Sequence, residues 1–340
     1  MRKYVITTLI LILFAFLVPW LTTEPSAQTE PSSDGAQESP QPDNAASLSP
    51  SVGGIDSRQM LRVLIGGETV EMDMATYLAG VVRAEMPAVF ESEALKAQAV
   101  AARTYTIHKI LNGGSENHPD ADACDDITCC KAYTDAAAAA ANWGTDAPQY
   151  EEKIRAAVRD TDGECILYEG SPILAVFHSS SVGATMDAAS VWSEAVPYLV
   201  SVSSPENSET VPNYYTSGAF TVSTLKTLLQ EALPETDLSG SHTQWFTDIT
   251  RTPSGTVTSV TVGGVTITGN RLRTILGLRS PCFTISFDGD SALFSVTGYG
   301  HGVGMSQYGA NVLASGGMNY REILAWYYTG TTVAVYGSPY

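Results

Sequence analysis

Hydrophobic and polar positions divide the chain into three parts, and the first is a long apolar run near the N-terminus. Residues 4–23 carry no charge and follow Arg2 and Lys3. About 20 apolar residues are enough for a helix to cross a bilayer, and paired cations favour a cytoplasmic N-terminus. We therefore expect residues 1–23 to form a cytoplasmic stub and a single-pass membrane anchor, with the rest of the chain outside the cytoplasm. A cleaved signal peptide shares both features and is the alternative.

The second part, residues 24–56, is rich in Pro, Ser, Ala, Gln and acidic residues, and the next basic residue is Arg58. Such a segment cannot bury enough apolar surface to offset the chain entropy that folding costs. We expect it to be a disordered acidic tether. The folded domain would then occupy residues 57–340, on the extracytoplasmic side.

The third part shows the periodicities of both strands and helices. Apolar residues alternate on either side of Gly66-Gly67, which predicts a β-hairpin, and they recur at helical spacing from Met74 until Pro87. A further strand is expected at 173–177. Two more hairpins are expected, one of strands 259–262 and 265–268 around Gly263-Gly264, and one of strands 284–287 and 292–297 around Asp288-Gly289. Further helices are expected at 92–111, 224–232, 271–276 and 320–328. Because strands and helices mix without a regular βαβ alternation, we predict an α+β fold, with two lobes around a deep substrate groove.

Glu85 is the first residue of this part whose setting suggests chemistry. It lies three and four positions after Val82 and Val81, so it continues the apolar face of its helix. Burial and the negative end of the helix dipole both disfavour a carboxylate and raise its pKa, as a general acid working near neutral pH requires. The alternative is an ordinary ion pair with one of three bases, Arg83, Lys96 or Arg103.

Two other segments can bring polar side chains towards Glu85. One is the helix at 92–111, and the other is the stretch HSSSVG, which follows the strand at 173–177. Polar side chains that gather at the end of a buried strand are well placed to contact a ligand. The candidate substrate contacts from these segments are Gln98, Arg103, Ser179 and Ser180. A serine hydrolase is not indicated, because no GxSxG elbow occurs.

The stretch GYGHGVGMSQYGA, residues 298–310, alternates glycines with polar residues. Glycines let the backbone approach a flat ligand, and they leave His301 and Gln307 prominent as hydrogen-bonding groups. A phosphate-binding loop is not indicated, because neither GxxxxGK[ST] nor GxGxxG is present. The alternative is that tight packing requires the glycines and that His301 is merely satisfied within the fold.

Three of the five cysteines lie with one histidine in HPDADACDDITCCKAY, residues 118–133. They cannot all pair with one another, and adjacent cysteines form a strained disulfide at best. Together the four residues make a closed Cys3His set of zinc ligands: His118, Cys124, Cys129 and Cys130. A closed set leaves no position for substrate, so we expect a structural zinc that stiffens the loop, away from the chemistry of Glu85. Free thiols, or disulfides that involve Cys165 or Cys282, are the alternative.

The net charge of the chain is −18, and only six of its acidic residues lie in the tether. The folded domain is therefore acidic as well. This charge argues against nucleic acid or anionic lipid as the main ligand, whereas a neutral or weakly charged polymer fits.

Several stretches resemble the stage II sporulation protein D family, in the order that the family has them. They are EMPAVFESEALKAQAVAARTY (85–105), FHSSSVGAT (177–185), VWSEAVPYLVSVSSPEN (191–207), GYGHGVGMSQYGA (298–310) and YREILAWYYTGT (320–331). The anchor and tether are also similar to those of the membrane-attached sporulation protein. The resemblance further implies zinc in the cysteine loop, where clostridial members carry a histidine followed by a cysteine and this chain has two cysteines.

The resemblance implies a lytic transglycosylase that cuts peptidoglycan between N-acetylmuramic acid and N-acetylglucosamine. One carboxylic acid, Glu85 by its motif position, would protonate the leaving oxygen and then act as a base while the muramoyl C6 hydroxyl group closes onto the anomeric carbon. The product carries a 1,6-anhydro ring, and no water is consumed. The family also implies peptide-stripped strands as substrate, and a membrane complex with a cell-wall amidase and another engulfment protein.

Two further function classes stay open at this point. The domain could be a non-catalytic peptidoglycan-binding activator of a cell-wall amidase, a role that also exists among proteins that share it. It could instead be a zinc amidase that uses His178, His242 or His301 as ligands. A zinc amidase would lose catalysis on chelation before its fold loosens, whereas a structural zinc predicts the reverse order.

Overall fold

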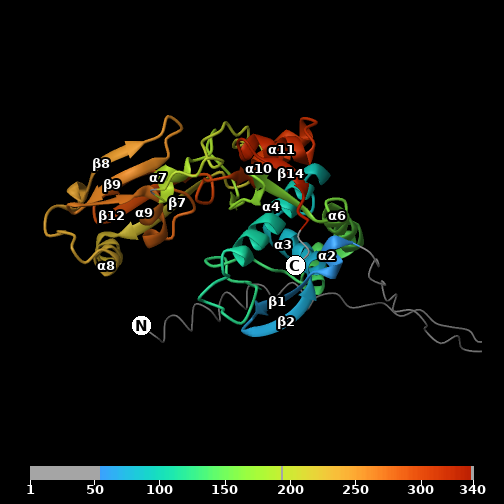
Figure 1. The fold of residues 1–340 in the computed structure, drawn as a ribbon. Coiled ribbons are helices and arrows are strands. Elements are labelled where there is room, and N and C mark those ends of the chain that lie inside the picture. Colours follow the sequence, from blue (N-terminus) through green and yellow to red (C-terminus); the bar gives the residue numbers. More distant parts are fainter. Residues whose placement is uncertain (1–53, 193, 338–340) are drawn as a thin grey trace, which may run out of the picture. The chain divides into compact units, whose positions relative to one another are not determined.

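The computed structural model describes residues 54–192 and 194–337 (Figure 1). The predicted anchor at 4–23 and the tether up to residue 53 lie outside the described residues. Among the residues described, none of the helices combines the length and the hydrophobicity that crossing a membrane requires. Helices and strands follow one another without regular βαβ order, so the predicted mixed α+β class is confirmed.

The first hydrophobic core surrounds α4 (Ser92–Leu111), which contacts α3 (Met74–Glu85), α6 (Ala147–Arg159), α10 (Gln307–Ser315), α11 (Tyr320–Tyr327) and β4 (Glu164–Tyr168). Most residues of α4 between Ala94 and Ile107 are buried, the polar Gln98 and Arg103 among them. Small side chains let neighbouring helices approach α4 closely. Its fully buried alanines are Ala94, Ala97, Ala99, Ala101 and Ala102.

The predicted first hairpin is confirmed. β1 (Met60–Ile65) and β2 (Glu68–Asp73) pair antiparallel, and β3 (Ala123–Cys124) adds to β1 in parallel. The turn needs positive φ angles at both central positions, 59° at Gly66 and 90° at Gly67, which glycine adopts without steric cost. Because β3 carries Cys124, this small sheet also places one end of the cysteine loop.

The other elements around the first core are short. They are α2 (Ile55–Arg58), α5 (Ala136–Trp143), η2 (Gly144–Asp146), β5 (Ser171–Pro172), β6 (Phe177–His178), α7 (Ala188–Trp192), β13 (Met305–Ser306) and β14 (Thr332–Val335). The strand predicted at 173–177 is buried, but most of it is irregular, and only β6 pairs, in parallel with β13. The apolar run was sufficient to predict burial, but strand pairing also needs a neighbour, and β13 offers only two residues.

The second hydrophobic core lies between two three-stranded sheets, β10-β9-β8 and β11-β12-β7, together with α8 and α9. Its elements, yellow to orange in Figure 1, are β7 (Tyr215–Thr221), α8 (Val222–Ala232), η3 (His242–Gln244), β8 (Phe246–Arg251), β9 (Val257–Val262), β10 (Val265–Thr268), α9 (Gly269–Leu276), β11 (Phe283–Asp288) and β12 (Ser291–Thr297). The hairpins predicted around 263–264 and 288–289 and both predicted helices are confirmed. The described residues thus contain two hydrophobic cores. The two lobes around a deep groove stay a prediction.

Asp56, which we expected to belong to the tether, lies in α2 and is part of the folded structure. The carboxylate of Asp56 binds the guanidinium of Arg103, with Nη2 2.6 Å from Oδ2, and both side chains are buried. Arg103 also donates to the carbonyl oxygen of Glu164 at 3.0 Å. Arg103 was expected to contact substrate, but it is 0% exposed and its donors are occupied. The structure thus assigns it the structural task of fixing α2 against α4.

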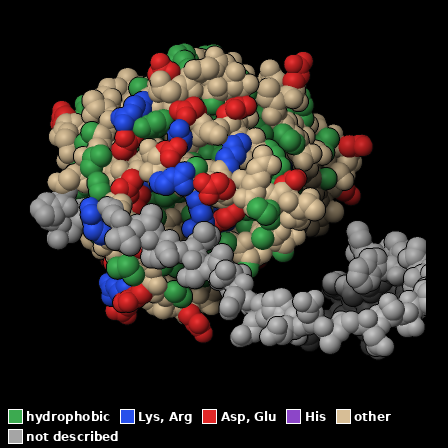
Figure 2. All heavy atoms as spheres, turned by 90° about the vertical axis from the view of Figure 1, so that its right-hand side faces the viewer, with side chains coloured by type: hydrophobic (Ala, Val, Ile, Leu, Met, Phe, Trp, Pro, Cys, Tyr) green, Lys and Arg blue, Asp and Glu red, His purple; other side chains and the backbone are tan. Residues whose placement is uncertain are grey.

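On α6, basic and acidic side chains pair at the surface, as in Arg155 with Glu151 and Arg159 with Glu152. Figure 2 shows the same interleaving of Lys and Arg with Asp and Glu on the face that it draws, without a broad area of positive charge. That face therefore lacks the basic surface that nucleic acids require.

The buried pair predicts that Arg103→Met lowers the free energy of unfolding by about 3–5 kcal/mol, because it leaves the Asp56 carboxylate buried without a partner. Arg62→Met is the matched control. Arg62 pairs with Asp122 at 3.4 Å, with half of its side chain exposed, so its loss should cost less than about 1 kcal/mol. Urea unfolding of the two variants measures the difference, and equal small losses would contradict the structural role of Arg103.

Candidate functional site

The carboxyl group of Glu85 lies at the last residue of α3. The helix starts at Asp73, whose side chain accepts the N–H of Thr76 at 2.8 Å, and it ends before Pro87. Tyr77, Leu78, Val81 and Val82 form its buried face. Glu85 continues this face and is half-buried, as its spacing predicted.

Three groups from distant parts of the sequence surround this carboxyl group. Gln307, the first residue of α10, donates from Nε2 to Glu85 Oε2 at 3.1 Å. The backbone N–H of Ala132 donates to it as well, and the charge of Lys131 acts on it. Gln98 joins indirectly, because Gln307 Nε2 lies 3.4 Å from its Oε1. The structure therefore brings together Glu85, Gln98 and Gln307, all named from the sequence.

Burial raises the pKa of Glu85 above its ordinary value. The positive charge of Lys131 and the hydrogen bonds from Gln307 and from the backbone of Ala132 act in the opposite direction, and burial outweighs them. Glu85 therefore keeps its proton to a higher pH than an exposed glutamate does. A carboxylic acid in this state can donate a proton near neutral pH.

The ion-pair alternative for Glu85 is contradicted. Each base considered for it has another carboxylate as partner: Glu151 for Arg83, Glu93 for Lys96 and Asp56 for Arg103. Glu85 itself has no ion pair among the described residues within salt-bridge distance. The nearby cation is Lys131, which sequence reasoning missed. Its position directly after Cys130 in the candidate metal loop was the available signal.

Lys131 is held between aromatic rings. Its Nζ lies 3.9 Å from the centroid of the Tyr105 ring and 4.1 Å from that of Phe177. Burial lowers the pKa of Lys131 to about 8, although the charge of Glu85 opposes this shift. No acceptor oxygen lies within hydrogen-bonding distance of this Nζ in the described part of the chain, so its contacts are the two rings and the charge of Glu85.

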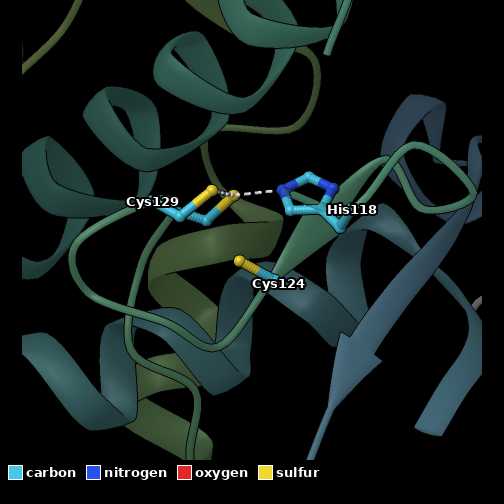
Figure 3. A group of neighbouring side chains, drawn as sticks. His118, Cys124 and Cys129 are labelled. Carbon is cyan, nitrogen blue, oxygen red and sulfur yellow. Dashed lines mark hydrogen bonds between the residues drawn. The ribbon is translucent and has the colours of Figure 1, made fainter. Parts of the chain in front are cut away.

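The four residues of the predicted metal site converge (Figure 3). The ligand atoms of His118, Cys124, Cys129 and Cys130 all lie within 4.8 Å of one another. His118 Nε2 is 3.2 Å from Cys130 Sγ, which is 4.0 Å from Cys129 Sγ. A tetrahedral zinc site with Zn–S near 2.3 Å and Zn–N near 2.0 Å places its donor atoms about 3.5–3.8 Å apart. The cluster thus has the donors and the spacing of a closed metal site.

The surroundings of the cluster also suit a metal ion. The Nδ1 of His118 lies 2.9 Å from the carbonyl oxygen of Ala121, which fixes the proton on Nδ1 and leaves Nε2 for the metal. Lys109 Nζ lies 3.2 Å from Cys129 Sγ and 3.0 Å from Cys130 Sγ. Three thiolates and one Zn²⁺ carry a net negative charge, which this ammonium would offset. All five cysteines are free thiols, so the disulfide alternative is contradicted.

The cysteine loop is closer to the chemistry than the sequence suggested. Cys129 and Cys130 directly precede Lys131 and Ala132, which act on the Glu85 carboxyl group. A metal ion that fixes the two cysteines would therefore also fix these neighbours. The expectation that the loop is separate from the site is corrected, because one short stretch of backbone serves both.

The other sequence candidates lie around β6 and β13. The hydroxyl group of Ser180 is buried without a partner among the described residues, and Ser179 is half-buried. His301 has both ring nitrogens occupied, because Nδ1 accepts the N–H of Val303 at 3.1 Å and Nε2 lies 3.0 Å from the carbonyl oxygen of Phe177. Burial lowers the pKa of His301 to about 3, so its ring is neutral. This arrangement fits the alternative in which His301 is satisfied within the fold.

The described residues offer no zinc site for the amidase alternative. His178 lies against Val303 O through Nδ1 and against Ser181 Oγ through Nε2, so its nitrogens are occupied like those of His301. His242 lies in η3 beside the second core, in ring contact with Trp245 and Phe287. The three histidines therefore do not present free nitrogens to one metal ion in the described structure.

Sequence reasoning also missed Glu206, which is 2% exposed. Its carboxylate accepts the N–H of Ser181 at 2.6 Å and the hydroxyl groups of Ser204 and Ser306. Ser306 in turn caps α10, the helix that starts with Gln307. This network ties the segments FHSSS, SSPEN and GMSQ together and thereby holds Gln307 in place. A single glutamate in an irregular segment gives no periodic signal, so its burial could not be anticipated.

Comparison with known proteins decides the family. A sequence model described as "Stage II sporulation protein" matches residues 67–168. A stage II sporulation protein D of Bacillus subtilis (strain 168) is 34% identical over 98% of this chain and 96% of its own length. That of Bacillus amyloliquefaciens is 36% identical over 76% and 73%. The chain belongs to the stage II sporulation protein D family.

Membership in this family connects the chain with sporulation through the names of these relatives. A further relative is named "Amidase enhancer", from Bacillus subtilis (strain 168). It is 29% identical to this chain, and the matched region covers 76% of this chain and 40% of that protein. The family resemblance noted from EMPAVFESEALKAQAVAARTY and the later stretches is thereby confirmed.

A structural metal in the Cys3His cluster predicts that Cys130→Ser lowers the melting temperature by more than about 5 °C, because the loop loses a ligand that fixes its shape. Chelation of the wild-type protein should lower it similarly, and elemental analysis should find about one zinc per chain. Differential scanning calorimetry measures the shift.

Cys282→Ser is the control, because Cys282 is a free thiol beside the second core and outside the cluster. Its melting temperature should stay close to that of the wild type, both with and without chelator. A Cys130→Ser protein that melts like the wild type and contains no less zinc would contradict the metal site.

Proposed function

We propose that the protein is a lytic transglycosylase that cleaves peptidoglycan glycan strands between N-acetylmuramic acid and N-acetylglucosamine, with Glu85 as its catalytic acid and base. The protonated carboxyl group gives its proton to the glycosidic oxygen as the bond to the anomeric carbon breaks. The resulting carboxylate then accepts the proton of the muramoyl C6 hydroxyl group, which attacks the anomeric carbon. The product ends in a 1,6-anhydro ring.

The observation that carries the proposal is the state of Glu85. A half-buried carboxyl group with a raised pKa and no ion pair in the described structure is suited to hold a proton and release it. Ordinary glycosidases use two carboxylates, because one of them activates water or attacks the sugar. Here the substrate supplies its own nucleophile, so one carboxyl group can serve both steps.

Other residues would support this one group. Gln307 orients the carboxyl group through its hydrogen bond, and Gln98 backs Gln307. Ser179 and Ser180, whose hydroxyl groups make no hydrogen bond in the described structure, would bind the sugar. His301 would support the backbone around them through Phe177. These contacts would line the deep groove that a polymer substrate needs.

The Cys3His cluster would hold zinc in a structural role. When bound, the metal would supply a rigid cross-link between β3 and the turn at Cys129 and Cys130. Through the adjoining backbone it would keep Lys131 and Ala132 at the Glu85 carboxyl group. The proton transfers themselves need only the side chain of Glu85.

The setting of this activity is also a proposal. The apolar run at 4–23 would anchor the domain in the cell membrane, so that it acts on the wall from outside the cytoplasm. The names of the relatives support a role in sporulation, and strands stripped of peptide during engulfment would be the substrate. The relative named "Amidase enhancer" supports a cell-wall amidase as a partner, in a membrane complex with another engulfment protein.

The same relative favours a second candidate, a non-catalytic peptidoglycan-binding activator of an amidase. The two candidates differ in one result, because only an enzyme releases anhydro-muramoyl products from purified glycan strands. Binding of glycan by the wild-type protein without any such product would establish the activator and refute the enzyme.

Replacement of the acid tests the assignment. Glu85→Gln keeps the shape and the hydrogen bonding but carries no transferable proton, so the release of anhydro products should fall by about 100- to 10,000-fold while glycan binding is kept. Glu91→Gln, an exposed glutamate six positions later, is the control and should leave the rate unchanged. Mass spectrometry of the products gives both rates. A Glu85→Gln protein with wild-type rates would refute the role of Glu85.

The raised pKa of Glu85 determines how the rate of product release depends on pH. Because the acid must be protonated, product release should be full below this pKa and fall as the pH rises through it. Gln307→Leu removes a hydrogen bond that favours the carboxylate, so the pKa of Glu85 should rise further and the falling limb should move to higher pH. Initial rates between about pH 4 and about pH 9 measure this limb.

Gln244→Leu, an exposed glutamine in η3, is the matched control and should leave the limb in place. A limb that moves to lower pH in Gln307→Leu would contradict the hydrogen bond as the cause.

A further inference from the structure

The ammonium group of Lys131 occupies an incomplete site. It lies over two aromatic faces, 3.9 Å from the centroid of the Tyr105 ring and 4.1 Å from that of Phe177. The residue as a whole is only partly buried. An ammonium has three N–H donors, and in the described structure none of them finds an acceptor oxygen in the protein. Ring faces attract a cation but do not replace these hydrogen bonds.

The charged groups around Lys131 do not complete the site either. Glu85 faces it and carries a negative charge only when it has lost its proton, which is the state after the first proton transfer. The charges of Cys130 and Lys109 also act on Lys131, in opposite directions. While Glu85 holds its proton, the ammonium therefore has no carboxylate partner in the described structure.

The missing partner has a definite chemistry. Each muramoyl residue carries a lactyl group on O3, two ring bonds from the anomeric carbon that Glu85 serves. In a peptide-free strand this group ends in a carboxylate, whereas an attached peptide turns it into a neutral amide. A charged acceptor binds an ammonium more strongly than a neutral one does, above all in a partly desolvated site.

We infer that Lys131 binds the lactyl carboxylate of the muramoyl residue at the cleavage site and thereby selects strands without peptide. This inference rests on the proposed function, since it takes a muramoyl residue to lie beside Glu85. The same contact brings a negative charge to Lys131 while Glu85 is protonated, so the substrate supplies the counter-ion that the free protein lacks. The rings of Tyr105 and Phe177 would fix the position of the ammonium group for this contact.

The experiment compares two substrates that differ in this one group. Peptide-free glycan strands are used as they are or after conversion of their lactyl carboxylates to amides. At pH 7 the wild-type protein should cleave the unmodified strands with about 10- to 100-fold higher kcat/KM, the difference between a charged and a neutral hydrogen-bond acceptor. Lys131→Gln should cleave both with nearly equal kcat/KM, whereas Lys131→Arg should retain most of the preference.

Lys226→Gln is the control variant, because Lys226 lies in α8 beside the second core. It should keep the wild-type preference. Thermal unfolding of each variant shows whether it is folded, and a ratio of two substrates on one protein sample does not depend on the folded fraction. A Lys131→Gln protein that keeps the full preference for the carboxylate overturns the inference.

A second measurement separates the inference from the proposed function. Isothermal titration of Glu85→Gln with a peptide-free tetrasaccharide and with its lactyl amide measures binding without turnover. The preference for the carboxylate should disappear in the double variant Glu85→Gln, Lys131→Gln. If the wild type forms no anhydro product, the proposed activity fails, while this binding preference still supports or refutes Lys131. If product forms but binding shows no preference, only the inference fails.

Discussion

The site depends on the partial burial of one carboxyl group, that of Glu85, without a permanent ion pair. Burial of Glu85 raises its pKa, and an adjacent base would normally reverse this effect. The structure avoids that outcome because the three bases closest in sequence are each committed to another carboxylate. Among the described residues, the cation that acts on Glu85 is Lys131, which is itself held between two aromatic rings.

This arrangement needs chain segments that are far apart in the sequence. Gln307 and Glu85 are 222 positions apart and meet through one hydrogen bond. Gln307 is placed by α10, which Ser306 caps, and Ser306 binds the buried Glu206. Gly309 is required in the same turn, because a Cβ atom there would lie 2.6 Å from a carboxylate oxygen of Glu206. A buried polar network of this kind fixes one arrangement of the surrounding backbone.

The candidate metal centre is connected to the Glu85 site through the backbone that follows Cys130. The sequence placed it in a loop of its own, and the four donors that it named do converge in the structure, because they lie within a short stretch of the chain. What could not be seen was that the backbone after Cys130 turns back to α3. A structural metal at this place would act on catalysis only through the position of Lys131 and Ala132, which is consistent with a closed ligand set.

Much of the fold could be predicted because the signals are local. Helical spacing gave α3 and placed Glu85 on its apolar face, and Gly-Gly and Asp-Gly turns gave the hairpins. The failures all involve contacts between distant residues. Arg103 was read as a substrate contact because its partner Asp56 lies 47 positions away in an acidic segment that looked like tether. Glu206 and Lys131 are single residues in irregular segments, where no periodicity marks them.

In the proposed reaction the substrate's own hydroxyl group, and not water, attacks the anomeric carbon after Glu85 has protonated the leaving oxygen. Cleavage of peptide-free glycan strands in H₂¹⁸O tests this step most directly, with mass spectrometry of the new ends. A lytic transglycosylase produces anhydro-muramoyl ends that contain no ¹⁸O. Ends that have gained one ¹⁸O atom would show hydrolysis and would contradict the account.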